Sequence, residues 1–404
     1  MVKVNKFNHN ERLNRKKVRI INLISFLLGF SAAIVAYIIS SYFKEIKGAD
    51  NVSAFYAAAY VISLVALLNF HKIIRKFGKS KVFLASTLAL SFSAILIFSL
   101  PVSRFGALLI VANIILYNLA IVGKDIILES YSVDSMSGQI RGMNLTLMNV
   151  GFLLGPFIST QILSKFSFQG VFLLQFAFMS IIFFVAFFHL RKVNHKFKPI
   201  VTVNGLIKKI TKRKNVMRIY YVSILLDIFY FIMIVYMPIY LRNLGMNWKE
   251  IGIIFSLMLI PFILLQYPAG RIADKKMGEK ELIILGLLMM SATTLGIFFV
   301  ESVNMYVWAV VLFLTRVGAA LIEILRDSYF YKRIDGTDVD VINFFKTSRP
   351  FGFLTASIVS AVSLMFLPLR YIFIILSIVI FSGLYPAVRL KDNLSEEEAL
   401  KMKK

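Results

Sequence analysis

Apolar segments of membrane-spanning length recur along the whole chain. Several runs hold about 18 to 25 residues without a charge, roughly what a helix needs to cross the hydrocarbon core of a bilayer. The 404 residues are 58% hydrophobic and 17% charged, and the mean hydropathy of +0.77 is too high for a soluble protein. The sequence therefore predicts a polytopic, all-α membrane protein.

The apolar runs predict twelve transmembrane helices. Their expected ranges are 18–43, 52–70, 81–100, 105–128, 142–164, 169–190, 217–241, 250–269, 281–300, 303–325, 341–367 and 369–388.

The distribution of Lys and Arg predicts the orientation. If the N-terminus is cytoplasmic, 38 of the 46 basic residues fall in cytoplasmic segments and 7 in external ones, and Arg316 lies within a helix. By the positive-inside rule both termini face the cytoplasm, and we expect a monomer in the plasma membrane. The same bias explains most of the net charge of +25, so no nucleic-acid partner is needed.

The sequence lacks the residues that several kinds of catalytic, metal and nucleotide site require. The chain has no cysteine, and its four histidines are too scattered to bind a metal together. No catalytic Ser/His/Asp set and no phosphate-binding Gly-x-x-x-x-Gly-Lys-Ser/Thr loop is present. The basic, polar start does not resemble a cleavable signal. We expect neither an enzyme nor a bound cofactor.

A basic segment divides the chain into two sets of six predicted helices. It covers residues 191–216, between an N-terminal bundle at 1–190 and a C-terminal bundle with a short tail at 217–404. Apolar residues from Val203 to Ile210 recur at helical spacing between lysines, as in an amphipathic helix on an anionic membrane surface. A solvated connector is the alternative.

The two halves resemble each other in sequence. At an offset of 198 residues, polar positions of the N-terminal half coincide with polar positions of the C-terminal half. The pairs are Asp125 with Glu323, Glu129 with Asp327, Ser130 with Ser328, Tyr131 with Tyr329, Asn118 with Arg316, and Ser25 with Ser223. Such spacing favours two pseudo-symmetric halves, a plan that secondary transporters use.

The segment after the eighth predicted helix resembles a loop signature of the major facilitator superfamily. Gly270, Asp274, Lys275 and Gly278 match Gly-x-x-x-Asp-Arg/Lys-x-Gly-Arg/Lys with one extra residue before the second glycine. The resemblance implies that this loop helps to close the cytoplasmic side. The loop at 71–79 keeps Lys76 and Gly78 but lacks the first glycine and the aspartate. A simple basic turn is the alternative for both loops.

A second resemblance lies in the fifth predicted helix. Gly151, Gly155 and Pro156 are similar to the Gly-x-x-x-Gly-Pro element of proton-linked antiporters in the same superfamily, without its terminal glycine pair. Glycines four apart permit close helix contact, and proline frees a carbonyl, so the helix is expected to bend during gating. Ordinary helix packing explains the pattern equally well.

The resemblance to the major facilitator superfamily covers nearly the whole chain. It implies a protein of twelve transmembrane helices that moves small solutes by alternating access. The family's first, fourth, seventh and tenth helices line the cavity. Asp227 lies in the seventh predicted helix and Arg316 in the tenth, at comparable depth. An ionisable residue within a membrane is a functional candidate by default. Asp227 is expected either to carry a proton or to serve as a counter-ion to Arg316.

The acidic pairs are expected near the cytoplasmic helix ends, and the two members of each pair are four positions apart, on one helix face. The preferred interpretation is that these acids form a cytoplasmic gate of salt bridges, and the alternative is that they only lie at solvated helix ends. The acids are Asp125, Glu129, Glu323 and Asp327, and the bases Lys76, Arg141, Lys275 and Arg349.

The sequence predicts a secondary transporter for a small organic solute, with proton coupling and export as expected features. The alternative within this class is a symporter for a sugar-like nutrient, with hydrogen bonds from Asn113, Tyr117, Asn118 and Gln266. An alternative of another class is a membrane sensor or scaffold that does not transport.

Overall fold

The structure is a computed structural model that describes residues 14–131, 137–191, 213–273, 277–333, 341, 344–345 and 347–391. In these ranges the regular structure is entirely helical, which confirms the predicted all-α class. The amphipathic helix predicted from Val203 to Ile210 lies outside them, as do Asp274 and Lys275. The side chains of Glu129 and Arg141 are also outside the description.

Most of the chain is divided among long helices and shorter helical pieces. They are α1 Arg15–Ala36, α2 Ile39–Lys47, α3 Ser53–Leu68, α4 Phe70–Phe77, α5 Lys79–Phe98, α6 Arg104–Glu129, α7 Ser137–Leu190, α9 Lys214–Asn243, α10 Trp248–Leu257, α11 Ile260–Leu264, α12 Gln266–Ile272, α13 Lys280–Ile297, α14 Met305–Lys332, α16 Ser348–Phe366, η3 Leu369–Tyr371, α17 Ile372–Ser382 and α18 Leu384–Val388.

Every expected transmembrane segment overlaps a helix, although the pieces differ from the expected spans. Ten helical stretches in the described ranges are long and apolar enough to cross a membrane, and Ser53–Leu67 forms a shorter apolar helix. One stretch, Thr146–Leu190, runs for 45 residues because α7 continues through the turn expected at 165–168. Ser167 interrupts its helical geometry with φ 53° and ψ −163°.

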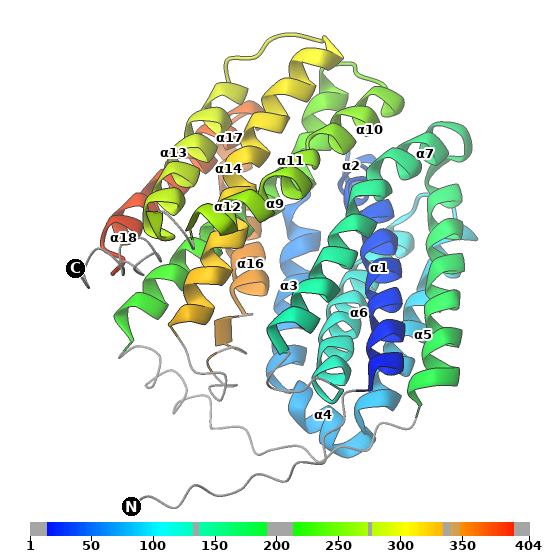
Figure 1. The fold of residues 1–404 in the computed structure, drawn as a ribbon. Coiled ribbons are helices and arrows are strands. Elements are labelled where there is room, and N and C mark those ends of the chain that lie inside the picture. Colours follow the sequence, from blue (N-terminus) through cyan, green and yellow to red (C-terminus); the bar gives the residue numbers. More distant parts are fainter. Residues whose placement is uncertain are drawn as a thin grey trace, which may run out of the picture.

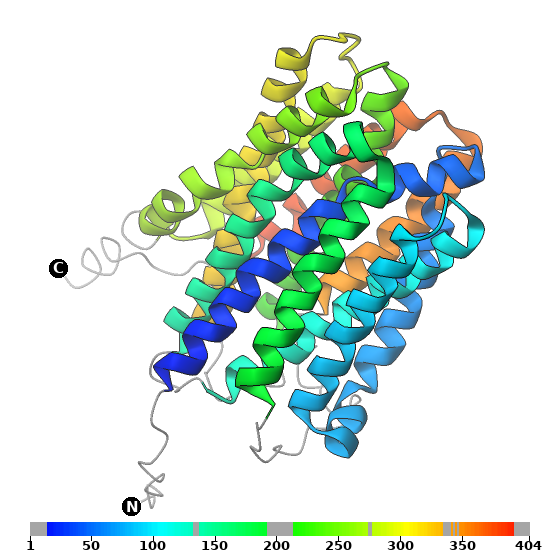
Figure 2. The same ribbon diagram turned by 90° about the vertical axis from the view of Figure 1, so that its right-hand side faces the viewer.

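In Figure 1, α1–α7 lie mainly on one side of the molecule and α9–α18 on the other. Figure 2 shows α1 lying along α7, against which it packs. We call α1–α7 the N-terminal group and α9–α18 the C-terminal group. They meet where α7 packs against α10, α3 against α16 and α2 against α9. Many large apolar side chains on the outside are exposed, as expected for surfaces that face lipid.

Hydrogen bonds place several helix ends at the same end of the molecule. The Lys17 amine at the start of α1 bonds the His189 carbonyl at the end of α7. Arg218, near the start of α9, bonds the Arg389 carbonyl just after α18. We call the end at which α7 ends and α9 begins the linker end.

The second glycine of each loop that resembles the family signature has a positive φ angle. Gly78 precedes α5 with φ 88°, and Gly278 lies two residues before α13 with φ 74°. This region of φ is costly for residues with a Cβ atom, so glycine is required at both turns. The predicted turn role of both residues is confirmed. A Cβ atom at Gly270 would lie 3.8 Å from Ile324, an ordinary contact, so close helix approach does not explain that glycine.

Glycines of α7 do permit close packing against α1. A Cβ atom at Gly151 would lie 2.7 Å from the Phe30 nitrogen, and one at Gly155 would lie 2.8 Å from the Ala33 carbonyl carbon. Both distances are too short for real contacts, so these glycines let the two backbones meet. The carbonyl of Pro156 accepts a hydrogen bond from the Thr160 hydroxyl at 2.8 Å. A bend at this point during gating stays a prediction.

Candidate functional site

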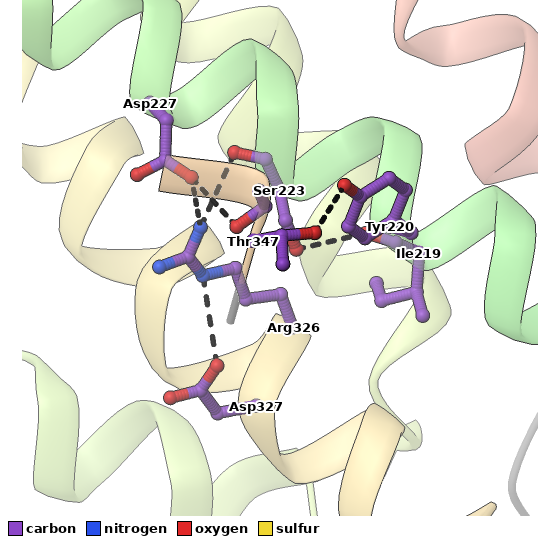
Figure 3. Close-up of polar contacts among 8 residues, drawn as sticks. Ile219, Tyr220, Ser223, Asp227, Arg326, Asp327 and Thr347 are labelled. Carbon is purple, nitrogen blue, oxygen red and sulfur yellow. Dashed lines mark hydrogen bonds and ion pairs between the residues drawn. The ribbon is translucent and has the colours of Figure 1, made fainter. Parts of the chain in front are cut away.

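A buried acid and a base join three helices near the linker end. Asp227 of α9 is 2% exposed, and one of its carboxylate oxygens lies 3.5 Å from Nη1 of Arg326 on α14. The Ser348 hydroxyl at the start of α16 donates to that carboxylate at 2.8 Å. Figure 3 shows Arg326 pointing from α14 toward Asp227. We call Asp227, Arg326 and Ser348 the ionic triad.

Arg326 is shared between two acids. Its Nε lies 3.6 Å from the Asp327 carboxylate, and its Nη1 also donates to the Ser223 carbonyl at 3.3 Å (Figure 3). One guanidinium therefore lies between the deeply buried Asp227 and the partly exposed Asp327. If Asp227 loses its charge, Arg326 still has a carboxylate beside it.

The backbone of α16 approaches α9 closely at the triad. A Cβ atom at Gly352 would lie 2.8 Å from the Cβ of Asp227 and 3.0 Å from the Ile224 carbonyl. Ser348 precedes Gly352 by four residues, so both face α9. One turn of α16 thus supplies both the hydroxyl and the space that the carboxylate needs.

Arg316 does not pair with Asp227, so the hypothesis that they form an ion pair is wrong. In the described part of the chain the base that meets Asp227 is Arg326. Arg316 lies ten residues before Arg326 in α14, about 15 Å along the helix axis, and its side chain meets aromatic rings of α9 instead of the carboxylate. Its guanidinium carbon is 4.8 Å from the ring centre of Phe229 and 6.0 Å from that of Tyr230.

Glu323 and Gln266 contact each other next to the triad. The side-chain amide of Gln266 on α12 donates to the Glu323 carboxylate at 2.9 Å. Arg349 is exposed, lies within electrostatic reach of Glu323 and Asp227, and stands 5.4 Å from the ring of Phe353. Gln266 thus holds an acid of α14, and its predicted role in solute binding stays a prediction.

The other predicted hydrogen-bonding residues join helices within the N-terminal group. Asn113 of α6 is buried and donates to Ser93 at 2.8 Å and to Gln175 at 3.5 Å. Asn118 donates to Ser63 of α3 at 3.1 Å, and the Tyr117 hydroxyl lies 3.5 Å from the Leu28 carbonyl of α1. A role in solute binding stays a prediction for all three.

A second buried base, Lys124 of α6, was missed as a site residue. It is 3% exposed, donates to the Asn144 side chain of α7 at 2.9 Å and lies 3.0 Å from the Asp125 carboxylate. Asn144 in turn donates to Ser25 of α1 at 2.6 Å. Lys124 was counted among the cytoplasmic positive charges, although an uninterrupted apolar run before it was a signal that it could be buried. Each helix group thus contains a base, Lys124 or Arg326, whose contacts link three helices.

The linker end also contains contacts between the two loops that resemble the family signature and serines at or near the ends of α6 and α14. Lys79 donates to Ser130 at 2.8 Å in the N-terminal group. Ser328 donates to Glu279 at 2.8 Å in the C-terminal group, and Lys332 pairs with Glu279 at 2.6 Å. The same serine position therefore ties the loop to the helix in both halves. The predicted pairing of Asp327 with Lys275 lies outside the described residues.

Of the remaining predicted gate residues, Lys76 is exposed on α4. Its amine lies 5.3 Å from the ring centre of Phe77. A gating role for Lys76, as for Asp125, stays a prediction.

Hydrogen bonds join the two helix groups at the end opposite the linker end. The Ser53 hydroxyl of α3 bonds Tyr236 of α9 and lies 3.0 Å from Ser360 of α16. The Asn51 side chain donates to the Ala361 carbonyl at 3.0 Å. Asn243 of α9 donates to Asp50 at 2.8 Å. We call this set of contacts the far-end closure, and sequence patterns did not reveal it because isolated serines and tyrosines are common in helices.

The chain was compared with known families, curated proteins and solved structures. The model of the Major Facilitator Superfamily matches residues 21–337 and 250–402. A search of curated proteins found no match.

Solved transporter structures share the fold at low identity. A structure of the POT family transporter PepTSo has 10% identity and a TM-score of 0.72, and the match covers 96% of this chain and 99% of that one. A D-xylose-proton symporter has 11% identity and a TM-score of 0.72, covering 94% and 98%. An auto-inhibited POT family peptide transporter has 11% identity and a TM-score of 0.73, with the same coverage.

The family match extends over nearly the whole chain, and the apolar helices have the length of membrane spans. The expected resemblance is confirmed: this multi-pass integral membrane protein belongs to the Major Facilitator Superfamily.

Proposed function

We propose that the protein is a secondary active transporter that moves a small organic solute by alternating access and couples this movement to protons. The ionic triad carries the proposal. It holds an acid in the membrane-spanning part of α9 and ties it to two other helices, and such an acid is a typical element of proton-coupled transport. The solved proton symporter has the same fold.

The triad offers a physical link between protonation and helix movement. A proton on Asp227 removes the charge that attracts Arg326, while Asp327 still attracts it from the other side. The tie between α9 and α14 weakens, and the hydrogen bond from Ser348 to an ionised oxygen is lost or weakened. Protonation thus loosens three helices at the linker end.

The helices are assigned to twelve membrane crossings in two halves of six. In this assignment α7 crosses twice, turning at Ser167, and the shorter α3 crosses once. We place the linker end in the cytoplasm on the basis of the positive-inside rule. The far-end closure then seals the external side, while the triad lies on the cytoplasmic side.

Transport in proteoliposomes tests this function. The protein is reconstituted with a pH-sensitive dye inside, and solute pools are added with and without a pH gradient. We expect at least one pool to move protons in a protein-dependent way, and Asp227→Asn to abolish this movement. Glu301→Gln, which changes an exposed acid between α13 and α14, is the matched control and should transport normally. Solute flux that neither depends on a pH gradient nor changes in Asp227→Asn would refute proton coupling.

A further inference from the structure

Arg316 differs from Arg326 and Lys124 in what surrounds it. Arg326 lies beside the carboxylate of Asp227, and Lys124 lies beside that of Asp125. Arg316 is 1% exposed, and its Nε and Nη1 have no hydrogen-bond partner among the described residues. Among the described residues Arg316 forms no close ion pair, although Glu323 on the same helix lies within electrostatic reach. A fully buried guanidinium without a close counter-ion is costly, so its retention calls for a reason.

Aromatic side chains form the surroundings of this guanidinium. Phe229 and Tyr230 of α9 present their rings at 4.8 and 6.0 Å from the guanidinium carbon. Tyr37, at the end of α1, lies beside it and packs against Phe255 of α10 with ring centres 4.8 Å apart. Aromatic faces attract a cation but supply no negative charge, so they offset only part of what burial costs.

The place of Arg316 in the fold fits a solute site. Arg316 lies near the middle of α14, and Tyr37 comes from the N-terminal group while Phe229 comes from the C-terminal group. Transporters built from repeats bind their solutes near the middle of the membrane, where the repeats meet. The hydroxyl of Tyr230 is also buried without a partner and adds a second free donor beside the guanidinium.

We propose that Arg316 binds the anionic group of the transported solute, and that the solute is a monocarboxylate with an aromatic or alicyclic body. This inference rests on the proposed transport function and names its substrate class. A guanidinium matches a carboxylate in shape and can donate two parallel hydrogen bonds to it. One guanidinium balances one negative charge, which favours a carboxylate over a phosphate monoester with its charge near −2. The surrounding rings suit an apolar body.

Binding to the purified protein tests the proposal without any gradient. The probes are benzoate, phenylacetate, cinnamate and cyclohexanecarboxylate, each paired with its neutral amide, and the readouts are calorimetry and thermal stabilisation. We expect at least one acid to bind about tenfold or more tightly than its amide, the effect of hydrogen bonds to a charged group. Arg316→Gln should make acid and amide bind equally. Tyr230→Phe should weaken acid binding by a smaller factor.

Arg370→Gln is the matched control. Arg370 also lies over an aromatic ring, 4.6 Å from that of Phe298, but it is exposed, so its loss should leave binding unchanged. In the absence of solute, Arg316→Met should raise the melting temperature, because it removes a buried charge that has no close counter-ion among the described residues. A purely structural Arg316 would give a lower melting temperature instead.

Two results would overturn the inference: no acid binds more tightly than its amide, or Arg316→Met lowers the melting temperature. Failure of the transport proposal looks different. In that case Arg316-dependent binding of an acid persists, but no probe crosses the membrane of proteoliposomes.

Discussion

Replacing Arg326 with glutamine should destabilise the protein strongly. The variant leaves the Asp227 carboxylate buried at 2% exposure with the Ser348 hydroxyl as its remaining described donor. Removing one partner of a buried ion pair costs about 3–5 kcal/mol, because the other charge stays in a medium that solvates it poorly. Asp227→Asn should cost less, because Arg326 keeps Asp327 at 3.6 Å and the Ser223 carbonyl at 3.3 Å.

The double variant Asp227→Asn, Arg326→Gln separates charge from packing. Both charges are gone and two amides of similar shape replace them, so the double variant should be more stable than Arg326→Gln alone. We expect a coupling energy of about 2 kcal/mol or more. Reversible unfolding in mixed micelles measures it, with fluorescence from Trp248 and the buried Trp308 as the signal.

The exposed pair of Glu301 and Arg370, 3.9 Å apart, provides the control cycle. Its coupling energy should stay below about 1 kcal/mol, as for most surface ion pairs. Additive effects at Asp227 and Arg326, or equal coupling in the two cycles, would refute the argument that the triad contains a desolvated ion pair.

Three further substitutions test the packing and the two ends of the molecule. Gly352→Ala should cost about 1–3 kcal/mol in the same unfolding assay, because its methyl group meets the Cβ of Asp227 at 2.8 Å. Gly296→Ala should be neutral or stabilising, because no atom of the described residues lies within 4 Å of the added methyl group. Lys124→Met should cost less than Arg326→Gln, under about 2 kcal/mol, because Asp125 is partly exposed; an equal or larger cost would contradict this. Ser360→Ala removes a hydroxyl from the far-end closure and should raise labelling of a Val52→Cys reporter by an impermeant maleimide about fivefold. The chain has no cysteine of its own, so the reporter is the only thiol, and unchanged labelling would show that this closure does not hold the end shut.

Physical rules that act locally explain what the sequence predicted well. A helix that spans a bilayer needs an apolar run of fixed length, so such runs predicted where helices form. A turn with positive φ needs glycine, so Gly78 and Gly278 could be assigned before their geometry was known. The repeat of 198 residues aligned Ser130 with Ser328, and in the structure each of these serines contacts the loop that precedes its neighbouring helix.

Relations between distant residues were predicted less well. Depth along the predicted helices suggested Arg316 as the partner of Asp227, but depth alone does not say which face of a helix a side chain occupies. Arg326 had been counted among the cytoplasmic charges, as had Lys124, because the positive-inside rule counts charges without asking whether they are buried. The role of Ser348 depends on the place of α16 beside α9, which no local pattern contains.

Simultaneous access measurements at both ends test the central claim of alternating access most directly. A Val52→Cys reporter marks the far end and an Ile324→Cys reporter marks the linker end, each in an otherwise cysteine-free chain. Conditions that change the balance of states, such as a transported solute or the Ser360→Ala substitution, should increase labelling at one end and decrease it at the other. Labelling that rises or falls together at both ends, or that responds at neither, would contradict the account.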